Sequence, residues 1–135
     1  MTETNTEPKR ILIVDDEPVI VQFVDRVLRG AGYATSTAGS GVEALRLAET
    51  AAPYDLVVAD VNMPEISGPE LIGKLRMKQP DLRVLYLTGY NDQLFAARNL
   101  LWEGEAFLDK PATIEGLLQA VSLMLFGNTK GGVKG

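Results

Sequence analysis

Three short, uninterrupted runs of apolar residues constrain the fold of this chain more than any other feature. They are Ile11–Val14, Leu56–Ala59 and Val84–Leu87. A strand reads as a continuous apolar run, rather than as an alternation, when helices cover both of its faces. Two weaker strands are predicted beside them, a more polar one at Tyr33–Thr37 and a short one at Ala106–Leu108. The sequence therefore predicts five strands, at least three of them buried on both sides.

Longer stretches with apolar residues at every third or fourth position separate these strands, and this period is typical of helices. Ser40 and Ser67 are each followed three residues later by a glutamate, the capping-box pattern of a helix start. Proline suits the first turn of a helix, and hydroxyl or carboxamide side chains suit the position before it. The predicted helices begin at Pro18, Ser40, Ser67, Asn91 or Asp92, and Thr113, the fourth continuing through Trp102.

Strands that alternate with helices indicate a parallel sheet with right-handed connections. The expected fold is therefore α/β, a flavodoxin-like (βα)5 domain with a doubly wound five-stranded parallel sheet in the order 2-1-3-4-5. Ligands of such sheets bind at the carboxyl ends of strands 1 and 3. The folded body is predicted to span 9–126, with a disordered polar tail at 1–8 and a flexible, glycine-rich tail or linker at 127–135.

The chain contains neither cysteine nor histidine. The first absence excludes disulfides, thiolate zinc sites and cysteine nucleophiles. The second excludes Ser/His/Asp triads and histidine-ligated metals. Carboxylates are therefore the main candidates for chemistry near neutral pH.

The net charge of −5 and the scattered positions of the 13 lysines and arginines disfavour direct binding to nucleic acid. The apolar runs are far shorter than the roughly 20 residues needed to cross a bilayer. The polar N-terminus lacks the apolar core of a signal peptide. We expect a cytoplasmic protein with no membrane contact.

Polar residues follow the predicted strands where ligands are expected: Asp15 and Asp16 after the first, Asp60 after the third, Thr88 after the fourth and Lys110 after the fifth. Two unit charges about 5 Å apart repel by roughly 3 kcal/mol at an effective dielectric constant near 20, so three converging carboxylates require a cation. Oxygen ligands without histidine or cysteine suit Mg²⁺. With that ion and Lys110 the five charged groups balance.

A site of this composition suits phosphoryl transfer, which depends mostly on positioning and on cations around the phosphoryl oxygens. Asp60 is the candidate nucleophile, because a carboxylate can attack phosphorus and form an acyl phosphate. Lys110 would pair with one phosphoryl oxygen, and the Thr88 hydroxyl would donate a hydrogen bond to another.

Four segments in this order resemble the receiver domain of bacterial two-component response regulators over residues 9–126. They are Ile11 to Glu17, Asp60 to Pro64 with Gly68, Leu87 to Gly89, and Phe107 to Pro111. The resemblance implies a phosphoacceptor switch rather than an enzyme. It also implies a sensor histidine kinase, or a phosphotransfer protein, as the partner that supplies the phosphoryl group.

The resemblance assigns roles to the acidic residues. Asp60 is implied to be the phosphoacceptor, and Asp16, Asp60 and the backbone carbonyl of Asn62 are implied to ligate Mg²⁺ directly, with Asp15 acting through water. The bond between Lys110 and Pro111 is expected to be cis, which proline permits at low cost.

Two further residues are implied to form a switch. Thr88 would move toward the phosphoryl group, and Phe107 would turn inward into the space that it leaves. This change would alter the surface of helix 4, strand 5 and helix 5, through which a downstream protein partner is expected to bind. Periodicity alone would make Phe107 a core residue.

Taken singly, the same residues have simpler explanations. Asp15 and Asp16 could cap the first helix, Asp60 could be a turn residue, Thr88 a strand end and Lys110 a solvated charge. It is their conjunction that favours a site.

Two other functions remain as alternatives. Gly39, Gly41 and Ala44 match a dinucleotide fingerprint, although they follow the second strand instead of the first. An aspartyl-nucleophile phosphohydrolase acting on an external substrate would commonly carry an acid two residues after Asp60, where this chain has Asn62, which cannot protonate a leaving group.

Overall fold

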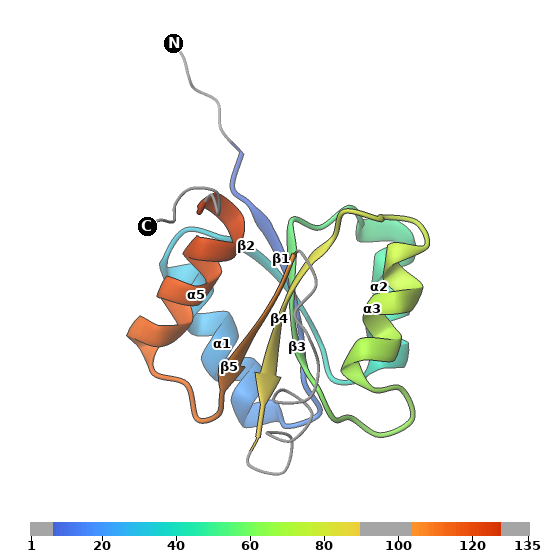
Figure 1. Cartoon of the computed structure of the whole chain (residues 1–135), viewed down its shortest axis with the longest axis horizontal. Helices are drawn as coiled ribbons and strands as arrows, with labels where there is room; N and C mark the ends of the chain where they lie inside the picture. Colours follow the sequence, from blue (N-terminus) through green and yellow to red (C-terminus); the bar gives the residue numbers. More distant parts are fainter. Residues whose placement is uncertain (1–6, 90–103, 128–135) are drawn as a thin grey trace.

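The computed structural model describes residues 7–89 and 104–127, in which a central sheet lies between two layers of helices (Figure 1). The strands are β1 (Arg10–Val14), β2 (Ala34–Ala38), β3 (Leu56–Asp60), β4 (Arg83–Thr88) and β5 (Glu105–Asp109). The helices are α1 (Pro18–Gly30), α2 (Gly41–Ala51), α3 (Gly68–Arg76) and α5 (Ile114–Phe126).

All strand pairs are parallel, and the order across the sheet is β2-β1-β3-β4-β5. The predicted α/β fold and strand order are confirmed. In the register of β1 and β3, Ile11 lies opposite Leu56 and Val14 lies opposite Ala59. Because the strands run the same way, their last residues meet at one edge, which is at the bottom of Figure 1. We call it the carboxyl edge, and the opposite one the amino edge.

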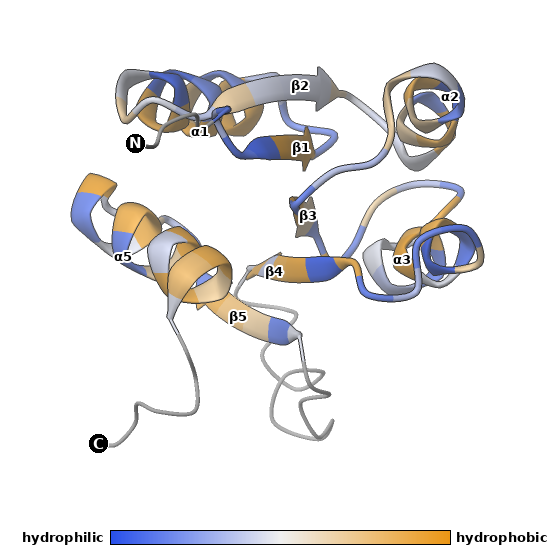
Figure 2. Ribbon diagram, turned by 90° about the horizontal axis from the view of Figure 1, so that it is seen from above, coloured by the Kyte–Doolittle hydropathy of each residue, from blue (hydrophilic) through white to orange (hydrophobic). Residues whose placement is uncertain are grey.

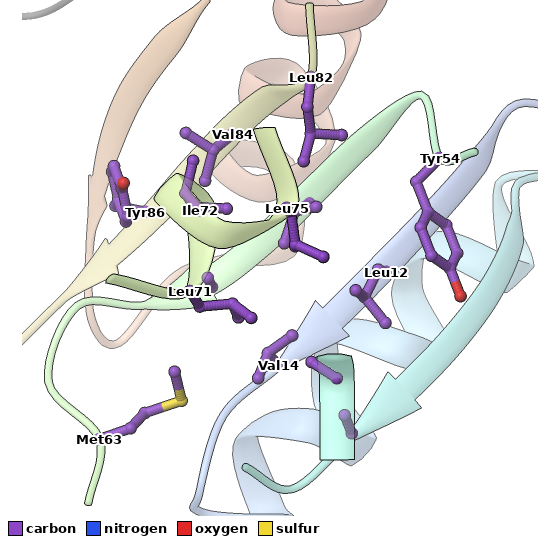
Figure 3. Packing of buried hydrophobic residues seen from close by; sticks show 14 of the residues in the cluster. Leu12, Val14, Tyr54, Met63, Leu71, Ile72, Leu75, Leu82, Val84 and Tyr86 are labelled. Carbon is purple, nitrogen blue, oxygen red and sulfur yellow. The ribbon is translucent and has the colours of Figure 1, made fainter. Parts of the chain in front are cut away.

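Successive residues of β1 face opposite sides of the sheet and belong to two different cores. Ile11 and Ile13 pack with the side chains of α1 and α5. Leu12 and Val14 pack with those of α2 and α3, among them Leu71 (Figure 3). Helix pairs α1/α5 and α2/α3 therefore cover the two faces, and their hydrophobic surfaces turn toward the sheet (Figure 2). Both faces of β1, β3 and β4 are buried, which explains their continuous apolar sequences.

The predicted helix starts differ in how their caps are completed. At Ser67 the capping box is complete, with Ser67 Oγ accepting from Glu70 N and Glu70 accepting from Ser67 N. At Ser40 only half of the box forms: Ser40 Oγ accepts from the backbone N–H of Glu43, but the Glu43 carboxylate accepts from Gly39 N.

The boundaries of the weaker elements are displaced from their predicted places. The second strand begins and ends one residue later than Tyr33–Thr37, and the fifth extends one residue beyond Ala106–Leu108 at each end. The predicted helix from Asn91 or Asp92 through Trp102 lies outside the described residues, as does most of each predicted tail.

Candidate functional site

The sheet brings the predicted site residues to its carboxyl edge. Asp60 and Thr88 are the last residues of β3 and β4, and Asp15 and Lys110 come directly after β1 and β5. The neighbouring backbones are tied together there: Lys110 N donates to Thr88 O at 2.8 Å, and Asp15 N donates to the carbonyl at the end of β2 at 3.3 Å. The regular parallel register therefore fixes where these side chains begin.

Three carboxylates converge at this edge. Carboxylate oxygens of Asp15, Asp16 and Asp60 all lie within 4.8 Å of one another. Asp15 and Asp60 are buried, at 0% and 4% exposure, whereas Asp16 is exposed. The predicted acidic cluster is thus present in the structure, with Asp16 on the side of the solvent.

Lys110 lies between the two buried carboxylates. Its Nζ is 3.1 Å from Asp15 Oδ2 and 3.2 Å from Asp60 Oδ1, and its side chain is only 15% exposed. The peptide bond between Lys110 and Pro111 is cis, as expected. Lys110 is therefore an internal counterion of the site rather than a solvated surface charge.

One lysine does not offset the cost of burying these carboxylates. Burial, reinforced by the charge of Asp15, raises the pKa of Asp60 to about 6, against the opposing effect of Lys110. Burial also raises the pKa of Asp15, although the N–H of Glu17 and Lys110 both act in the other direction. Burial alone would lower the pKa of Lys110, but the two carboxylates outweigh it and the pKa is raised. Lys110 therefore remains charged at neutral pH.

The loop after β3 turns closely around Asp60. Asn62 N donates to Asp60 Oδ1 at 3.4 Å, and Gly68 N donates to Val61 O at 2.9 Å. A Cβ atom at Gly68 would lie 2.3 Å from the carbonyl oxygen of Asp60, so only glycine allows α3 to start this close to the strand. The glycine of the predicted motif therefore has a steric explanation.

Thr88 contacts a residue that the sequence did not single out. Its hydroxyl, on a residue that is 1% exposed, donates to Asp109 Oδ1 at 2.9 Å. Thr88 and Asp109 are opposite each other at the ends of β4 and β5. The signal was available in principle, because two residues that end adjacent parallel strands are neighbours, but it required the register of the short fifth strand.

Phe107 is half-buried on β5. Its ring is stacked on that of Tyr86, with the centroids 5.3 Å apart and the planes at 28°. Phe107 also packs against the core cluster beneath α2 and α3. This position agrees with the interpretation of Phe107 as a core residue.

The donor set fits a hard divalent cation. Asp15 Oδ2 is buried and, apart from its ion pair with Lys110, accepts no hydrogen bond from the described residues. With Asp16 and Asp60 it provides an all-oxygen cluster of three negative charges against one lysine. Mg²⁺ prefers such ligands and commonly keeps several waters, for which the exposed position of Asp16 leaves access.

Several simpler explanations do not agree with the structure. Glu17, not Asp15 or Asp16, occupies the cap position of α1, and α1 has no side-chain cap. The dinucleotide fingerprint lies beside the edge strand β2. A Cβ atom at Gly41 would lie 2.9 Å from Ile66 Cβ, so this glycine packs against a side chain and does not face an open phosphate site.

A family model described as the response regulator receiver domain matches residues 11–122 of the chain. The chain is 39% identical over 117 residues to the sensor kinase CckA of Brucella abortus, covering 85% of this chain and 12% of the kinase. It is 35% identical over 125 residues to the probable transcriptional regulatory protein TcrX of Mycobacterium tuberculosis, covering 93% of this chain and 53% of that protein. The chain thus spans about half or less of these two relatives.

Solved structures give the same result. A CheY-like response regulator receiver domain protein from Methanospirillum hungatei superposes with a TM-score of 0.76 at 28% identity, covering 93% of this chain and all of the other.

Within the described ranges, no helix combines the length and the apolar character needed to cross a membrane.

Proposed function

This chain belongs to the response regulator receiver domain family, and from that premise we propose that Asp60 is its phosphoacceptor. Receiver domains accept phosphoryl groups and are not enzymes acting on an external substrate, and they imply a histidine kinase as partner. The observation that supports Asp60 is its place in the site. Its carboxylate is buried at the carboxyl edge, 3.2 Å from Lys110 and beside two further carboxylates.

The phosphoryl group would come from the phosphohistidine of a sensor kinase or phosphotransfer protein, or from a small acyl phosphate. Asp60 Oδ1 is held by Lys110 and the Asn62 N–H, so we assign the attack to Oδ2. The bond from Oδ2 to phosphorus forms while the bond from phosphorus to the imidazole nitrogen breaks. The imidazole keeps the bonding electron pair and takes a proton from solvent. With a pKa of about 6, Asp60 is ionised and nucleophilic at neutral pH.

Asp16, Asp60 and the backbone carbonyl of Asn62 would hold Mg²⁺, with Asp15 acting through water. When bound, the ion would offset the negative charge that develops on the phosphoryl oxygens. Lys110 would supply a second positive charge to the same oxygens, because its Nζ already lies beside Asp60.

Thr88 and Phe107 would carry the signal outward. Thr88 would donate a hydrogen bond to a phosphoryl oxygen, and Phe107, whose ring is already stacked on that of Tyr86, would turn further inward. Both residues lie at or next to β5, so their movement would change the face expected from β5, α5 and the predicted fourth helix, which lies outside the described residues. A downstream protein partner would bind that face. α5 contributes exposed apolar side chains, Ile114 and Leu123, of the kind found at binding surfaces.

A phosphohydrolase with an aspartyl nucleophile is the rival function. It would need a general acid to protonate the leaving group. The position two residues after Asp60, where that acid commonly lies, is occupied by Asn62. It would release phosphate repeatedly and accumulate little phosphoprotein.

Incubation with Mg²⁺ and acetyl phosphate, followed by intact mass measurement, tests the proposal. We expect one phosphoryl group on the unchanged chain and none on Asp60→Asn. A chelator should prevent the reaction, because the uncompensated carboxylates repel an anionic donor. Asp81→Asn removes an exposed carboxylate at the amino edge and is the matched control, with unchanged uptake. Equal uptake by Asp60→Asn would refute the assignment.

A further inference from the structure

The hydrogen bond between Thr88 and Asp109 points to a role for a residue outside the acidic cluster. We propose that Asp109 is a positioning residue, which holds the Thr88 hydroxyl on β5 in the unmodified protein and thereby opposes the switched state. The inference rests on the proposed function, since it concerns which acceptor Thr88 uses before and after Asp60 is phosphorylated. Thr88 Oγ1 lies 2.9 Å from Asp109 Oδ1 across the β4/β5 pair.

The two acceptors exclude each other. A threonine hydroxyl has a single proton and can donate one strong hydrogen bond at a time. An ionised carboxylate only accepts, so the proton of Thr88 lies between Oγ1 and Asp109 in the structure. A phosphoryl oxygen on Asp60 is a charged acceptor of the same kind. For Thr88 to donate to it, the bond to Asp109 must break and the side chain must rotate.

The surroundings of Asp109 favour a competition between Asp109 and a phosphoryl oxygen on Asp60 for the Thr88 hydroxyl. Asp109 is exposed, whereas Thr88 is buried at 1% exposure, so the hydroxyl is held in place by a carboxylate that solvent can reach. Within residues 7–89 and 104–127, no lysine or arginine forms an ion pair with Asp109. It is also not a member of the carboxylate cluster that could hold a metal ion. Its negative charge is therefore left uncompensated by these residues, beside the place to which the phosphoryl group would bring more negative charge.

A contact made in only one of two states shifts their equilibrium by its own free energy. The Thr88–Asp109 bond has a charged acceptor, which strengthens it, but the acceptor is exposed, which weakens it. We therefore expect the loss of this bond to favour the switched state by about fivefold. The same factor should appear in the affinity for a phosphoryl mimic, because binding of the mimic is linked to that equilibrium.

The test measures affinity for beryllofluoride in the presence of Mg²⁺ by amide NMR titration of the full chain. Asp109→Ala should bind the mimic about fivefold more tightly than the unchanged protein. Asp109→Asn keeps an acceptor oxygen but loses the charge, and its affinity should lie between the two. Asp81→Asn removes an exposed charge at the opposite edge and should bind like the unchanged protein. Equal affinities of Asp109→Ala and the unchanged chain would overturn the proposal.

Two further measurements separate positioning through Thr88 from a general charge effect. In a Thr88→Val background, Asp109→Ala should no longer change the affinity, because there is no hydroxyl to release. If the fivefold gain persists there, Asp109 acts through its charge alone and the positioning role is wrong. Three-bond couplings to the Thr88 methyl carbon should report one χ1 rotamer in the unchanged protein and averaging in Asp109→Ala.

Failure of the proposed function would look different. In that case the unchanged chain would not bind the mimic with Mg²⁺, or Asp60→Asn would bind it equally well. Normal binding by the unchanged chain, together with no difference in Asp109→Ala, would reject only the role of Asp109.

Discussion

The two edges of the sheet differ in how far their charged groups are compensated by partners. At the amino edge, several charged and polar side chains of the described residues pair with specific partners. Arg10 donates to Pro53 O at 2.7 Å and, through its backbone N–H, to Asp55 Oδ2 at 2.8 Å. The side chain of Gln79 both accepts from Tyr54 N and donates to Tyr54 O.

Arg76 completes the amino edge. It binds Leu82 O through two nitrogens and forms an ion pair with Glu105 at 2.9 Å. At the carboxyl edge, by contrast, three carboxylates share one lysine, and burial keeps the pKa of Asp60 above its ordinary value. The contacts of the amino edge thus stabilise the domain, whereas the carboxyl edge holds more negative charge than the described residues compensate.

The largest effect is expected where the carboxyl edge has no steric tolerance. Gly68→Ala would place a methyl group 2.3 Å from the carbonyl oxygen of Asp60, a backbone atom that cannot rotate away. We expect the free energy of unfolding in urea to fall by about 3 kcal/mol, and phosphoryl uptake to slow because the Asp60 loop must move.

Gly73→Ala is the matched control within the same helix. A Cβ atom there meets nothing within 4 Å, and alanine should raise stability by about 0.5–1 kcal/mol because it favours the helix. If both variants are equally stable, the close approach at Gly68 is not a constraint.

The second-largest effect is expected when the charge imbalance at the carboxyl edge is reduced by Asp60→Asn. The pKa of Asp60 is about 6 in the folded protein and near 3.8 when unfolded, so between these values the folded chain binds a proton that the unfolded chain has released. Stability due to this residue therefore falls as pH rises from about 4 to 6, and the full penalty persists above pH 6. With chelator present, Asp60→Asn should be more stable than the unchanged protein by roughly 2–3 kcal/mol at pH 7.5.

The two proteins should be equally stable below about pH 3, because Asp60 is then largely protonated in both the folded and the unfolded states. Thermal or urea unfolding across this pH range measures the difference. Gln119→Ala, which removes no ionisable group, should show no such pH-dependent gain. A constant difference between Asp60→Asn and the unchanged protein at all pH values would contradict the electrostatic origin.

The smallest effect is expected at the amino edge. Gln79→Ala removes both hydrogen bonds to the backbone of Tyr54, whose N–H and C=O then lose their side-chain partner. The free energy of unfolding should fall by about 1.5 kcal/mol, with phosphoryl uptake by the folded protein unchanged. Gln119→Ala, at an exposed position on α5, should stay within about 0.5 kcal/mol of the unchanged protein. A loss of phosphoryl uptake in Gln79→Ala would show that the two edges are not independent.

The carboxyl edge could be predicted from the sequence further than the amino edge could. Continuous apolar runs reveal buried strands, and in a parallel sheet the residues that follow them must meet, which is enough to bring Asp15, Asp60 and Lys110 together. The polar contacts of the amino edge join residues such as Arg76 and Glu105, which lie far apart in the sequence and follow no periodic pattern.

Contacts that depend on the register between strands could not be predicted from the sequence for the same reason. A run of three apolar residues, Ala106–Leu108, does not fix how far the fifth strand slides along the fourth, so the pairing of Thr88 with Asp109 could not be anticipated. The steric role of Gly68 likewise depends on how closely α3 approaches the backbone of Asp60. Half of the capping box at Ser40 was wrong, because the Glu43 carboxylate reaches the N–H of Gly39 instead.

The position of Lys110 between two carboxylates has a consequence for how the site responds to its surroundings. Lys110 is a counterion of the two buried carboxylates that is covalently part of the chain, so it is present at every concentration of salt or metal. A divalent ion, by contrast, occupies its place only in proportion to its free concentration relative to its dissociation constant. Lys110 therefore provides a constant positive charge next to Asp60, whereas the rest of the compensating charge varies with the concentration of free metal ion. If Asp60 is the phosphoacceptor as proposed, the site would respond both to the phosphoryl donor and to the concentration of free divalent ion.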